Sequence, residues 1–285
     1  MDGYAIRRMA RPELSVAIES AAAEGWNPGL RDAEAFWAAD PDGFFLGLLD
    51  GRPAATVSAV RYDSGRGGGF GFMGFFVVRP ELRGQGLGLR LWRTAQAALQ
   101  ARGAAVIGLD AVLGQVETYR KSGFEPARIS SRYQGRAGGE MPQGLLPLSG
   151  GSFDEVLAYD GRCFPGRREA FLRSWLDLPG HVALGTRRGG ALAGFGVLRP
   201  CGVGAKIGPL FADDVAVARD LLRGLLASAP EGPVFFDAPA TNPAAARLAE
   251  DHGMRVVFQT GRMYLGGVPE YDLGREFGVA SFELG

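Results

Sequence analysis

One short segment has the residue types and the spacing to bind an anion. It reads Arg83-Gly84-Gln85-Gly86-Leu87-Gly88 and lies between an apolar strand pattern, which Pro80 ends, and a helical pattern. Glycines allow close backbone approach, the N–H groups at a helix start are unpaired, and an arginine adds a fixed positive charge. The segment lacks the Gly-Lys-Ser/Thr end of a Walker loop, and Leu89 replaces the third glycine of the dinucleotide pattern. It therefore predicts a pyrophosphate site without a kinase lysine.

The elements that position this segment alternate between strands and helices. Side-chain periodicity predicts strands over residues 4–8, 44–49, 54–62, 70–78 and 104–111, and helices over residues 12–24 and 115–121, with a short helix around Phe36 and Trp37 and another after Gly86. Asp50-Gly51 is typical of a hairpin turn. A closing strand that starts at Gly123-Phe124 would complete the order β-α-α-β-β-β-α-β-α-β by about residue 135.

The second half of the chain repeats part of this succession. Helices are predicted over 153–164, 167–176 and 215–228, and strands over 181–186, 191–198 and 234–237. Asp237-Ala238 leading to His252-Gly253-Met254 parallels Asp110-Ala111 leading to Ser122-Gly123-Phe124. Residues 137–150 have linker composition, so we expect two copies of one fold, in domains 1–148 and 149–285.

Two motifs resemble those of a known family. Residues Val78 to Gly88 resemble the V-x-P-x-x-[RQ]-x-x-G-x-[GA] signature of the Gcn5-related N-acetyltransferases (GNAT), and Tyr119 to Phe124 resemble the later Y-x-x-x-G-F element. The resemblance covers residues 4–135 well, and the second half is similar to the degenerate second domain of some bacterial members. It implies an α/β (α+β) chain with tandem GNAT folds, each a mixed, mostly antiparallel sheet flanked by helices.

The resemblance also implies acetyl-coenzyme A as the acetyl donor. Arg83 and the backbone N–H groups of the glycine-rich segment would hold its pyrophosphate, and a free strand edge would pair with its pantetheine arm and polarise the thioester. The implied cofactor-binding residues are Phe76, Val77, Val78, Arg83, Gly84, Gln85, Gly86, Leu87, Gly88 and Tyr119.

Acetyl transfer to an amine needs a deprotonated nucleophile and a proton for the leaving thiolate. Tyr119 is the candidate acid, because a phenol with a reference pKa of about 10 is protonated at neutral pH; packing beside the cofactor is the alternative. Glu24 is a candidate base in a turn where related enzymes build the acceptor site, or a solvated helix-end carboxylate. Asp110 is the alternative base, or a cap for the loop that follows it.

Aromatic residues near Glu24 predict an acceptor pocket. Trp26, Asn27 and Tyr62, with Phe36 and Trp37, could enclose an amine that carries some apolar surface, or form core. We therefore expect transfer to the primary amine of a small molecule, by direct attack in a ternary complex. The alternatives are a protein amine as acceptor, and a module that senses acyl-coenzyme A without turnover.

The second copy departs from the cofactor pattern. The segment expected to connect its strand and helix, 207–214, reads Ile-Gly-Pro-Leu-Phe-Ala-Asp-Asp, without the arginine and the alternating glycines, and Ala249 stands where Tyr119 would be. Two carboxylates would repel a pyrophosphate. We therefore predict that this half binds no acetyl-coenzyme A. Asp237, Asn242 and Arg262 could still form a site there, or act as caps.

Composition excludes several classes of protein. Of the 285 residues, 46% are apolar and 22% charged, which excludes whole-chain disorder, and the 31 basic and 31 acidic residues give no reason to expect nucleic-acid binding. No apolar run approaches the roughly 18 residues of a membrane span. Two cysteines without a leader pattern indicate a cytoplasmic protein, and two scattered histidines argue against a metal. The oligomeric state stays open.

Overall fold

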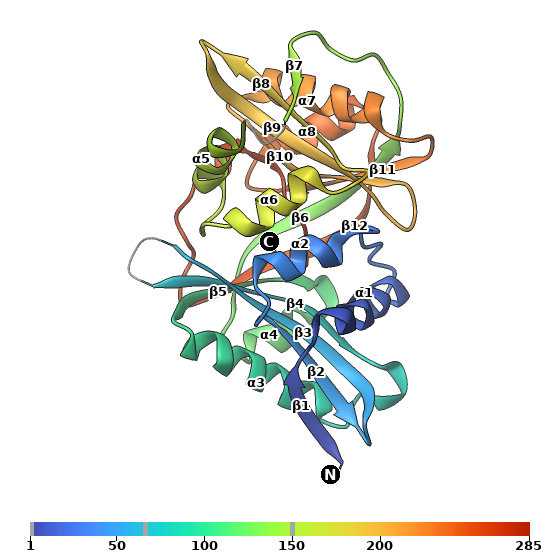
Figure 1. The fold of residues 1–285 in the computed structure, drawn as a ribbon, viewed down its shortest axis with the longest axis vertical. Coiled ribbons are helices and arrows are strands. Elements are labelled where there is room, and N and C mark those ends of the chain that lie inside the picture. The colour runs from blue at the N-terminus through green and yellow to red at the C-terminus, as the bar shows by residue number, and fades with distance from the viewer. Residues whose placement is uncertain (1–2, 65–67, 149–151) are drawn as a thin grey trace.

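The protein has two lobes that share one sheet (Figure 1). The computed structural model describes residues 3–64, 68–148 and 152–285. The sheet has 13 strands, twelve of them in the order β1-β2-β3-β4-β5-β12-β6-β11-β10-β9-β8-β7, and β13 pairs with β10 off this path. The run Gly67-Gly68-Gly69 predicts a tight connection into the strand expected over 70–78, but Gly67 lies outside the described residues, as do the first residues after the predicted boundary at 148.

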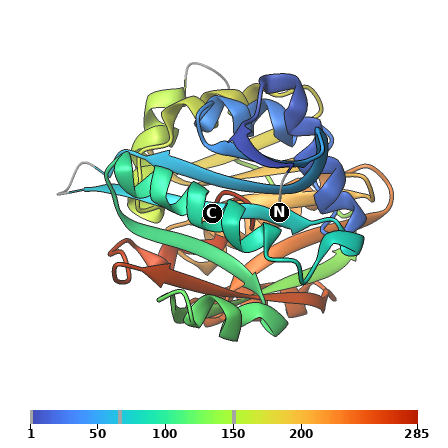
Figure 2. The same ribbon diagram turned by 90° about the horizontal axis from the view of Figure 1, so that it is seen from below.

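The first lobe follows the predicted succession closely. Asp50 and Gly51 have φ angles of 49° and 76°, which confirms the hairpin between β2 and β3. Helices α1 and α2 cover one face of the sheet and α3 covers the other (Figure 2). The elements are β1 (Tyr4–Arg8), α1 (Leu14–Ala23), α2 (Asp32–Ala39), β2 (Phe44–Leu49), β3 (Arg52–Tyr62), β4 (Gly69–Val78), α3 (Leu87–Ala101), β5 (Ala104–Val112) and α4 (Val116–Arg120).

The second lobe repeats this order. Its elements are β7 (Leu145–Pro147), α5 (Phe153–Cys163), α6 (Glu169–Asp177), β8 (Val182–Arg188), β9 (Ala191–Pro200), β10 (Ala205–Ala212), α7 (Val215–Ser228), β11 (Pro233–Pro239), α8 (Pro243–Asp251) and β13 (Glu276–Gly278). Two expectations are wrong here. The expected linker contains β7, which pairs with β8, and most of segment 207–214 is not a connection but β10, the counterpart of β4.

The two lobes exchange their closing strands. Strand β6 (Glu125–Arg136) belongs to the first half of the chain but pairs with β11, whereas β12 (Arg255–Leu265) belongs to the second half and pairs with β5. The two exchanged strands also pair with each other. The division at residue 148 therefore remains a prediction about the sequence, while in space each lobe contains one strand from the other half.

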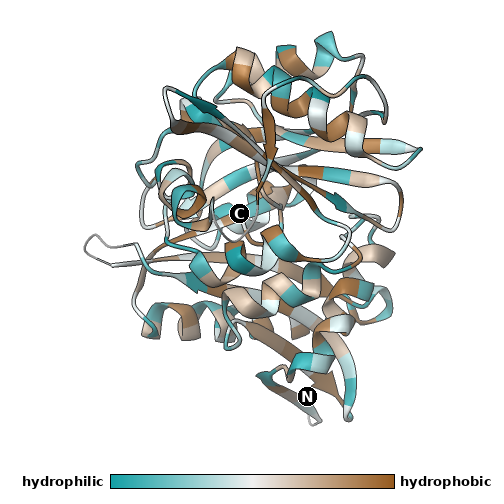
Figure 3. Ribbon diagram, turned by 45° about the horizontal axis from the view of Figure 1, so that its top comes forward, coloured by the Kyte–Doolittle hydropathy of each residue, from teal (hydrophilic) through white to brown (hydrophobic). Residues whose placement is uncertain are grey.

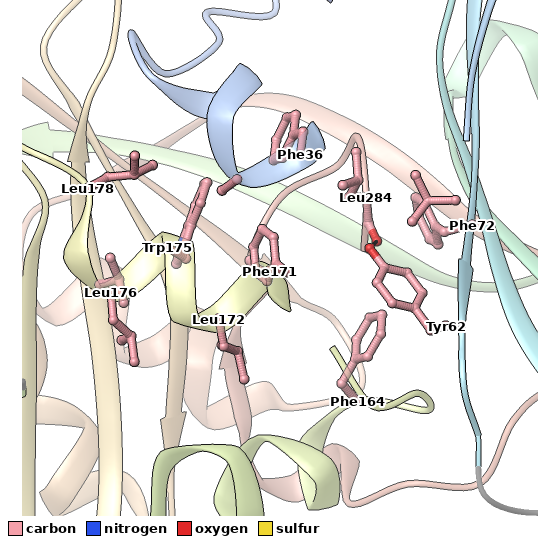
Figure 4. Packing of buried hydrophobic residues seen from close by; sticks show 14 of the residues in the cluster. Phe36, Tyr62, Phe72, Phe164, Phe171, Leu172, Trp175, Leu176, Leu178 and Leu284 are labelled. Carbon is pink, nitrogen blue, oxygen red and sulfur yellow. Dashed lines mark hydrogen bonds between the residues drawn. The ribbon is translucent and has the colours of Figure 1, made fainter. Parts of the chain in front are cut away.

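A shared apolar core joins the lobes. The ring of Phe36 on α2 lies 5.9 Å from Trp175 and 6.4 Å from Phe171, both on α6, and Tyr62 lies 5.1 Å from Phe164 (Figure 4). The hydropathy colouring shows apolar and polar residues alternating along these helices (Figure 3), as amphipathic packing requires. The lobes therefore form one packed body whose centre is built from both halves.

Candidate functional site

The site begins where β4 and β5 separate. These parallel strands pair as far as Met73 and Leu109, although both continue beyond that point. A register shift between β3 and β4 bends β4 there, and Phe75 has a φ of 47°, with its carbonyl accepting a 2.8 Å hydrogen bond from the Thr56 hydroxyl. The backbone edge of residues 76–78 is therefore unpaired on the side that faces β5, as the predicted pantetheine contact needs.

The glycine-rich segment forms a loop that enters α3. Gly84 and Gly86 have φ angles of 77° and 78°, a region that favours glycine, and Gly86 caps α3 without any side-chain hydrogen bond. A Cβ on Gly88 would lie 2.7 Å from Cγ2 of Val78, so this glycine lets the helix approach β4. The first N–H groups of α3 remain available, and the helix dipole favours an anion at this end.

A cavity of about 460 Å³ connects the separated strands with the space between the lobes. One end carries residues predicted for the cofactor and the other carries aromatic and charged residues from both halves of the chain. The lining residues are Glu24, Trp26, Met73, Gly74, Phe75, Phe76, Val77, Val78, Arg83, Trp92, Leu109, Asp110, Val112, Gln115, Thr118, Tyr119, Arg132, Phe258, Thr260, Phe282 and Glu283.

Tyr119 lies in the cofactor end of this cavity, on α4. Its ring packs 5.1 Å from Trp92 and 6.4 Å from Phe124. Burial raises the pKa of Tyr119 to about 12, so the phenol stays protonated throughout the neutral range. Its hydroxyl makes no hydrogen bond to the part of the chain that the structure describes, so it is available as a donor.

Glu24 and Arg83 form an ion pair at the mouth of the cavity. The Arg83 Nε also donates to the carbonyl of Val78 at 2.9 Å, which fixes the guanidinium beside the end of β4. The pair joins Glu24, which is predicted to contact the acceptor, to Arg83, which is predicted to bind the pyrophosphate. A bound phosphate would compete with Glu24 for Arg83, because both are anions that accept from a guanidinium.

Asp110 is held by an arginine from the other half of the chain. Arg262 on β12 donates to both carboxylate oxygens, at 2.8 and 2.6 Å, and the two side chains are 0% and 2% exposed. The guanidinium lies 4.8 Å from the Phe72 ring centroid. Asp110 lines the cavity but is directed at Arg262, which favours a structural role for this carboxylate over that of a base.

The predicted acceptor residues separate into two groups. Trp26 lines the cavity, and its carbonyl accepts from Arg132 and Lys206, each at 3.0 Å. Asn27 is instead hydrogen-bonded to the backbone of Val203, at 2.9 and 2.8 Å, outside the lining. Tyr62 lies in the core between the lobes and donates to the Leu284 carbonyl at 3.1 Å (Figure 4). These placements correct the expectation that Asn27 and Tyr62 enclose the acceptor, and Phe36 and Trp37 are likewise core residues.

Comparisons with known proteins agree with this geometry. A model described as "Acetyltransferase (GNAT) family" matches residues 5–124, and one described as "Acetyltransferase (GNAT) domain" matches residues 156–277. The holothin acyltransferase of Pseudoalteromonas sp. (strain SANK 73390) is 32% identical over 276 residues, which are 96% of this chain and 92% of that protein. The chain belongs to the GNAT family.

Solved structures share the whole tandem GNAT arrangement. A protein from Pyrococcus horikoshii, described as an acetyltransferase, has a TM-score of 0.84 at 21% identity and covers 100% of this chain and 97% of its own. A GCN5-related N-acetyltransferase from Sphaerobacter thermophilus has a TM-score of 0.63 at 16% identity, with coverage of 96% and 99%. At these identities the likeness shows the fold alone. The predicted family, fold class and acyltransferase activity are confirmed.

Among the residues that the structure describes, the second GNAT fold has no open counterpart of this site. Strands β10 and β11 pair over 205–207 and then separate, as β4 and β5 do, but β13 fills the gap by pairing with β10, and Val279 N–H donates to the Asp237 carbonyl at 3.0 Å. At the start of α7, Asp214 accepts from the N–H groups of Ala216 and Val217 at 2.9 and 3.0 Å. The chain itself thus occupies the positions that pantetheine and pyrophosphate would need.

The three residues that could form a site in the second lobe instead cap a helix or form ion pairs. Asn242 caps α8 by accepting from Ala244 N–H at 3.2 Å, which agrees with capping. Asp237 accepts from Arg132 on the exchanged strand β6, at 2.7 and 2.8 Å, and Arg262 pairs with Asp110 as described. Both ion pairs cross between the halves of the chain and are buried.

Sequence reasoning missed the cavity residues that come from the second half of the chain, and one from the first half that lies in the second lobe. Those from the second half are Phe258 and Thr260 on β12, and Phe282 and Glu283 after β13. Arg132 precedes the predicted boundary, but its strand β6 pairs with β11 of the second lobe. The Thr260 hydroxyl is buried and has no hydrogen-bond partner within the described residues. No local pattern marks these residues, because their positions depend on the strand exchange and on the path of residues 279–285.

The described ranges 3–64, 68–148 and 152–285 show neither a metal-ligand cluster nor a membrane-spanning helix. They contain no group of three or more His, Cys, Asp or Glu side chains placed to hold a metal ion. Over the same ranges, no helix is both long and apolar enough to cross a membrane.

Proposed function

We propose that this GNAT enzyme transfers the acetyl group of acetyl-coenzyme A to the primary amine of a small molecule, by direct attack in a ternary complex. The observation that carries the proposal is the single cavity in which the unpaired edge of β4 and the protonated Tyr119 meet an aromatic chamber built by both lobes. Donor and acceptor can therefore be held together, which favours direct transfer.

The donor end fits acetyl-coenzyme A in both charge and shape. The loop 83–88 supplies backbone N–H groups, a helix N-terminus and the Arg83 guanidinium for the pyrophosphate. The free edge at residues 76–78 offers backbone groups to the pantetheine amides, and a backbone N–H there can polarise the thioester carbonyl.

The acceptor end favours a small amine over a protein segment. Trp26, Phe258 and Phe282 contribute aromatic surface, and Arg132 closes the chamber while paired to Asp237. A protein substrate would need an open groove, whereas this chamber lies between two packed lobes. The relative named holothin acyltransferase makes holothin a reasonable member of an acceptor panel.

The transfer has three coupled parts. The amine nitrogen attacks the thioester carbon and forms the C–N bond, the C–S bond breaks with its electron pair going to sulfur, and the nitrogen loses a proton to solvent or to a base. Tyr119 is placed to donate its phenolic hydrogen toward the departing sulfur. A pKa of about 12 makes it a weak acid, so its main contribution is a hydrogen bond to the developing thiolate, which solvent protonates in the end.

The test is release of coenzyme A from acetyl-coenzyme A, followed with a thiol reagent, over a panel of small amines that includes holothin. We expect turnover with at least one amine, and loss of both binding and turnover in Gly88→Val, whose side chain would enter the space next to Val78. Gly161→Ala is the matched control, because no atom lies within 4 Å of a Cβ there. Tight binding of acetyl-coenzyme A without turnover on any amine or peptide would favour the sensor alternative.

A further inference from the structure

The last residues of the chain bring a carboxylate into the cavity. Residues 279–285 follow β13 and run back to the first lobe, where a Cβ on Gly74 would lie 2.0 Å from the Glu283 carbonyl oxygen. Hydrogen bonds hold this segment on both sides: Arg199 donates to the Ala280 carbonyl and Arg168 to the Gly285 oxygen, each at 3.1 Å. The position of Glu283 is therefore fixed by contacts of its neighbours rather than by its own side chain.

Glu283 differs from the other carboxylates that line the cavity. Glu24 is paired with Arg83 and Asp110 with Arg262. The Glu283 side chain makes no hydrogen bond and no ion pair with any residue that the structure describes, although the residue is only 3% exposed. Its carboxylate oxygens are not among the buried atoms that lack a partner, so they are accessible within the cavity, where a cationic ligand could reach them.

Basic side chains lie near Glu283. Lys206 is buried, donates to the Trp26 carbonyl at 3.0 Å, and has no ion-pair partner among the described residues. Burial lowers the pKa of Lys206 and the nearby Glu283 opposes that shift, so the two charges interact at longer range. Arg132 and Arg199 also face Glu283, but each is paired with an aspartate, Asp237 and Asp32 respectively.

The aromatic residues beside Glu283 complete a site for an organic cation. Trp26, Phe258 and Phe282 line the same end of the cavity, and the Arg132 guanidinium already lies 4.9 Å from the Phe282 ring centroid and 5.8 Å from that of Phe258. Aromatic faces attract ammonium groups, and apolar ring edges accept the rest of an amine that carries a ring.

We propose that Glu283 binds the ammonium of a primary amine that carries an aromatic ring and accepts the proton that nitrogen must lose before it attacks. This inference rests on the proposed function and names its acceptor class and its base. One ammonium proton passes to the Glu283 carboxylate, and the neutral amine then forms the C–N bond. The electron pair of the C–S bond goes to the sulfur of coenzyme A, and the second proton lost by nitrogen reaches that thiolate through solvent. Glu283 then releases the proton to water, which completes the cycle without an additional reactant.

The first test measures binding and needs no knowledge of the natural acceptor. Benzylamine and benzyl alcohol are titrated into the full chain loaded with coenzyme A, by calorimetry. We expect wild-type protein to bind benzylamine at least tenfold more tightly than benzyl alcohol, and Glu283→Gln to abolish that difference. Glu140→Gln, at an exposed position, is the control and should behave as wild type. No binding of benzylamine to wild-type protein at 10 mM overturns the proposal.

The second test separates proton removal from binding. With benzylamine as acceptor, we expect Glu283→Gln to lower kcat at least 100-fold while the KM for acetyl-coenzyme A changes less than threefold, and Glu283→Asp to recover part of the loss. Unchanged kcat in Glu283→Gln, with acetyl-coenzyme A still bound, refutes the role of Glu283 and leaves the proposed function intact. Failure of wild-type protein to bind acetyl-coenzyme A refutes the proposed function itself.

Discussion

Replacing Gly74 by alanine tests whether the end of the chain builds the cavity. The new Cβ would lie 2.0 Å from the Glu283 carbonyl oxygen and 2.8 Å from its carbonyl carbon, both backbone atoms. Real Cβ contacts essentially never fall below 3.0 Å, so segment 279–285 or β4 must move by about 1 Å. A shift of that size at a reacting centre costs about 100-fold in rate, and overpacking costs about 1–3 kcal/mol of stability.

The matched control is Gly71→Ala on the same strand. Its Cβ would lie 2.5 Å from a methyl of Leu99, a side chain of α3, so it overpacks the first lobe without touching segment 279–285. We expect both variants to lower the melting temperature by about 3–10 °C, but only Gly74→Ala to lower kcat/KM by about 100-fold. Thermal melts and coenzyme A release measure the two effects. Equal activity losses in the two variants would refute the reasoning.

Three further predictions concern single side chains. Tyr119→Phe should lower kcat about 100-fold in steady-state assays, while calorimetry should give an unchanged affinity for acetyl-coenzyme A. Because the pKa of Tyr119 is about 12, this group should cause no loss of rate between about pH 7 and 10. A kcat equal to that of the wild type in the variant would remove Tyr119 from the mechanism. Asp110→Asn leaves Arg262 buried without a counter-charge, so denaturant unfolding should show that the free energy of unfolding falls by about 3–5 kcal/mol. Adding Arg262→Met should restore part of this stability. Loss of activity at full stability would instead favour Asp110 as the base. Burial holds the pKa of His181 at about 4, below its usual value, so the unfolded chain binds a proton on this imidazole more tightly than the folded chain does. The free energy of unfolding should therefore fall by about 2 kcal/mol as the pH is lowered from about 6.5 to 4. His181→Gln should lack this part of the pH dependence, and a pH profile identical to that of the wild type would contradict the prediction.

Much of the first lobe could be predicted from local patterns. The loop 83–88 is recognisable because its glycines and arginine stand next to one another, and α3 because Leu87, Leu91, Ala95 and Leu99 repeat at helical spacing and are all buried. Tyr119 could be assigned to the same site because it belongs to a second motif. Each of these signals is contained in a few consecutive residues.

The rest depends on contacts between distant parts of the chain. The exchange of β6 and β12 leaves no local signal, because each strand pairs with residues far away in the sequence and carries no motif that names its partner. Tyr62 is aromatic and close to the site in sequence, yet its ring packs on Phe164 of the other half. Glu283 lies 259 positions from Glu24, and only the path of residues 279–285 places both at one cavity. The expected connection at 207–214 proved to be mostly strand: its glycine and proline, which suggested a turn, lie within β10.

The central claim is that one lobe binds acetyl-coenzyme A while the other is filled by its own chain. Isothermal titration calorimetry of the full chain with acetyl-coenzyme A tests it most directly, because stoichiometry counts the open sites. One site per chain, lost in Gly88→Val and unaffected by Asp214→Ala, is the predicted result. Two sites per chain, or one site that survives Gly88→Val, would contradict the account.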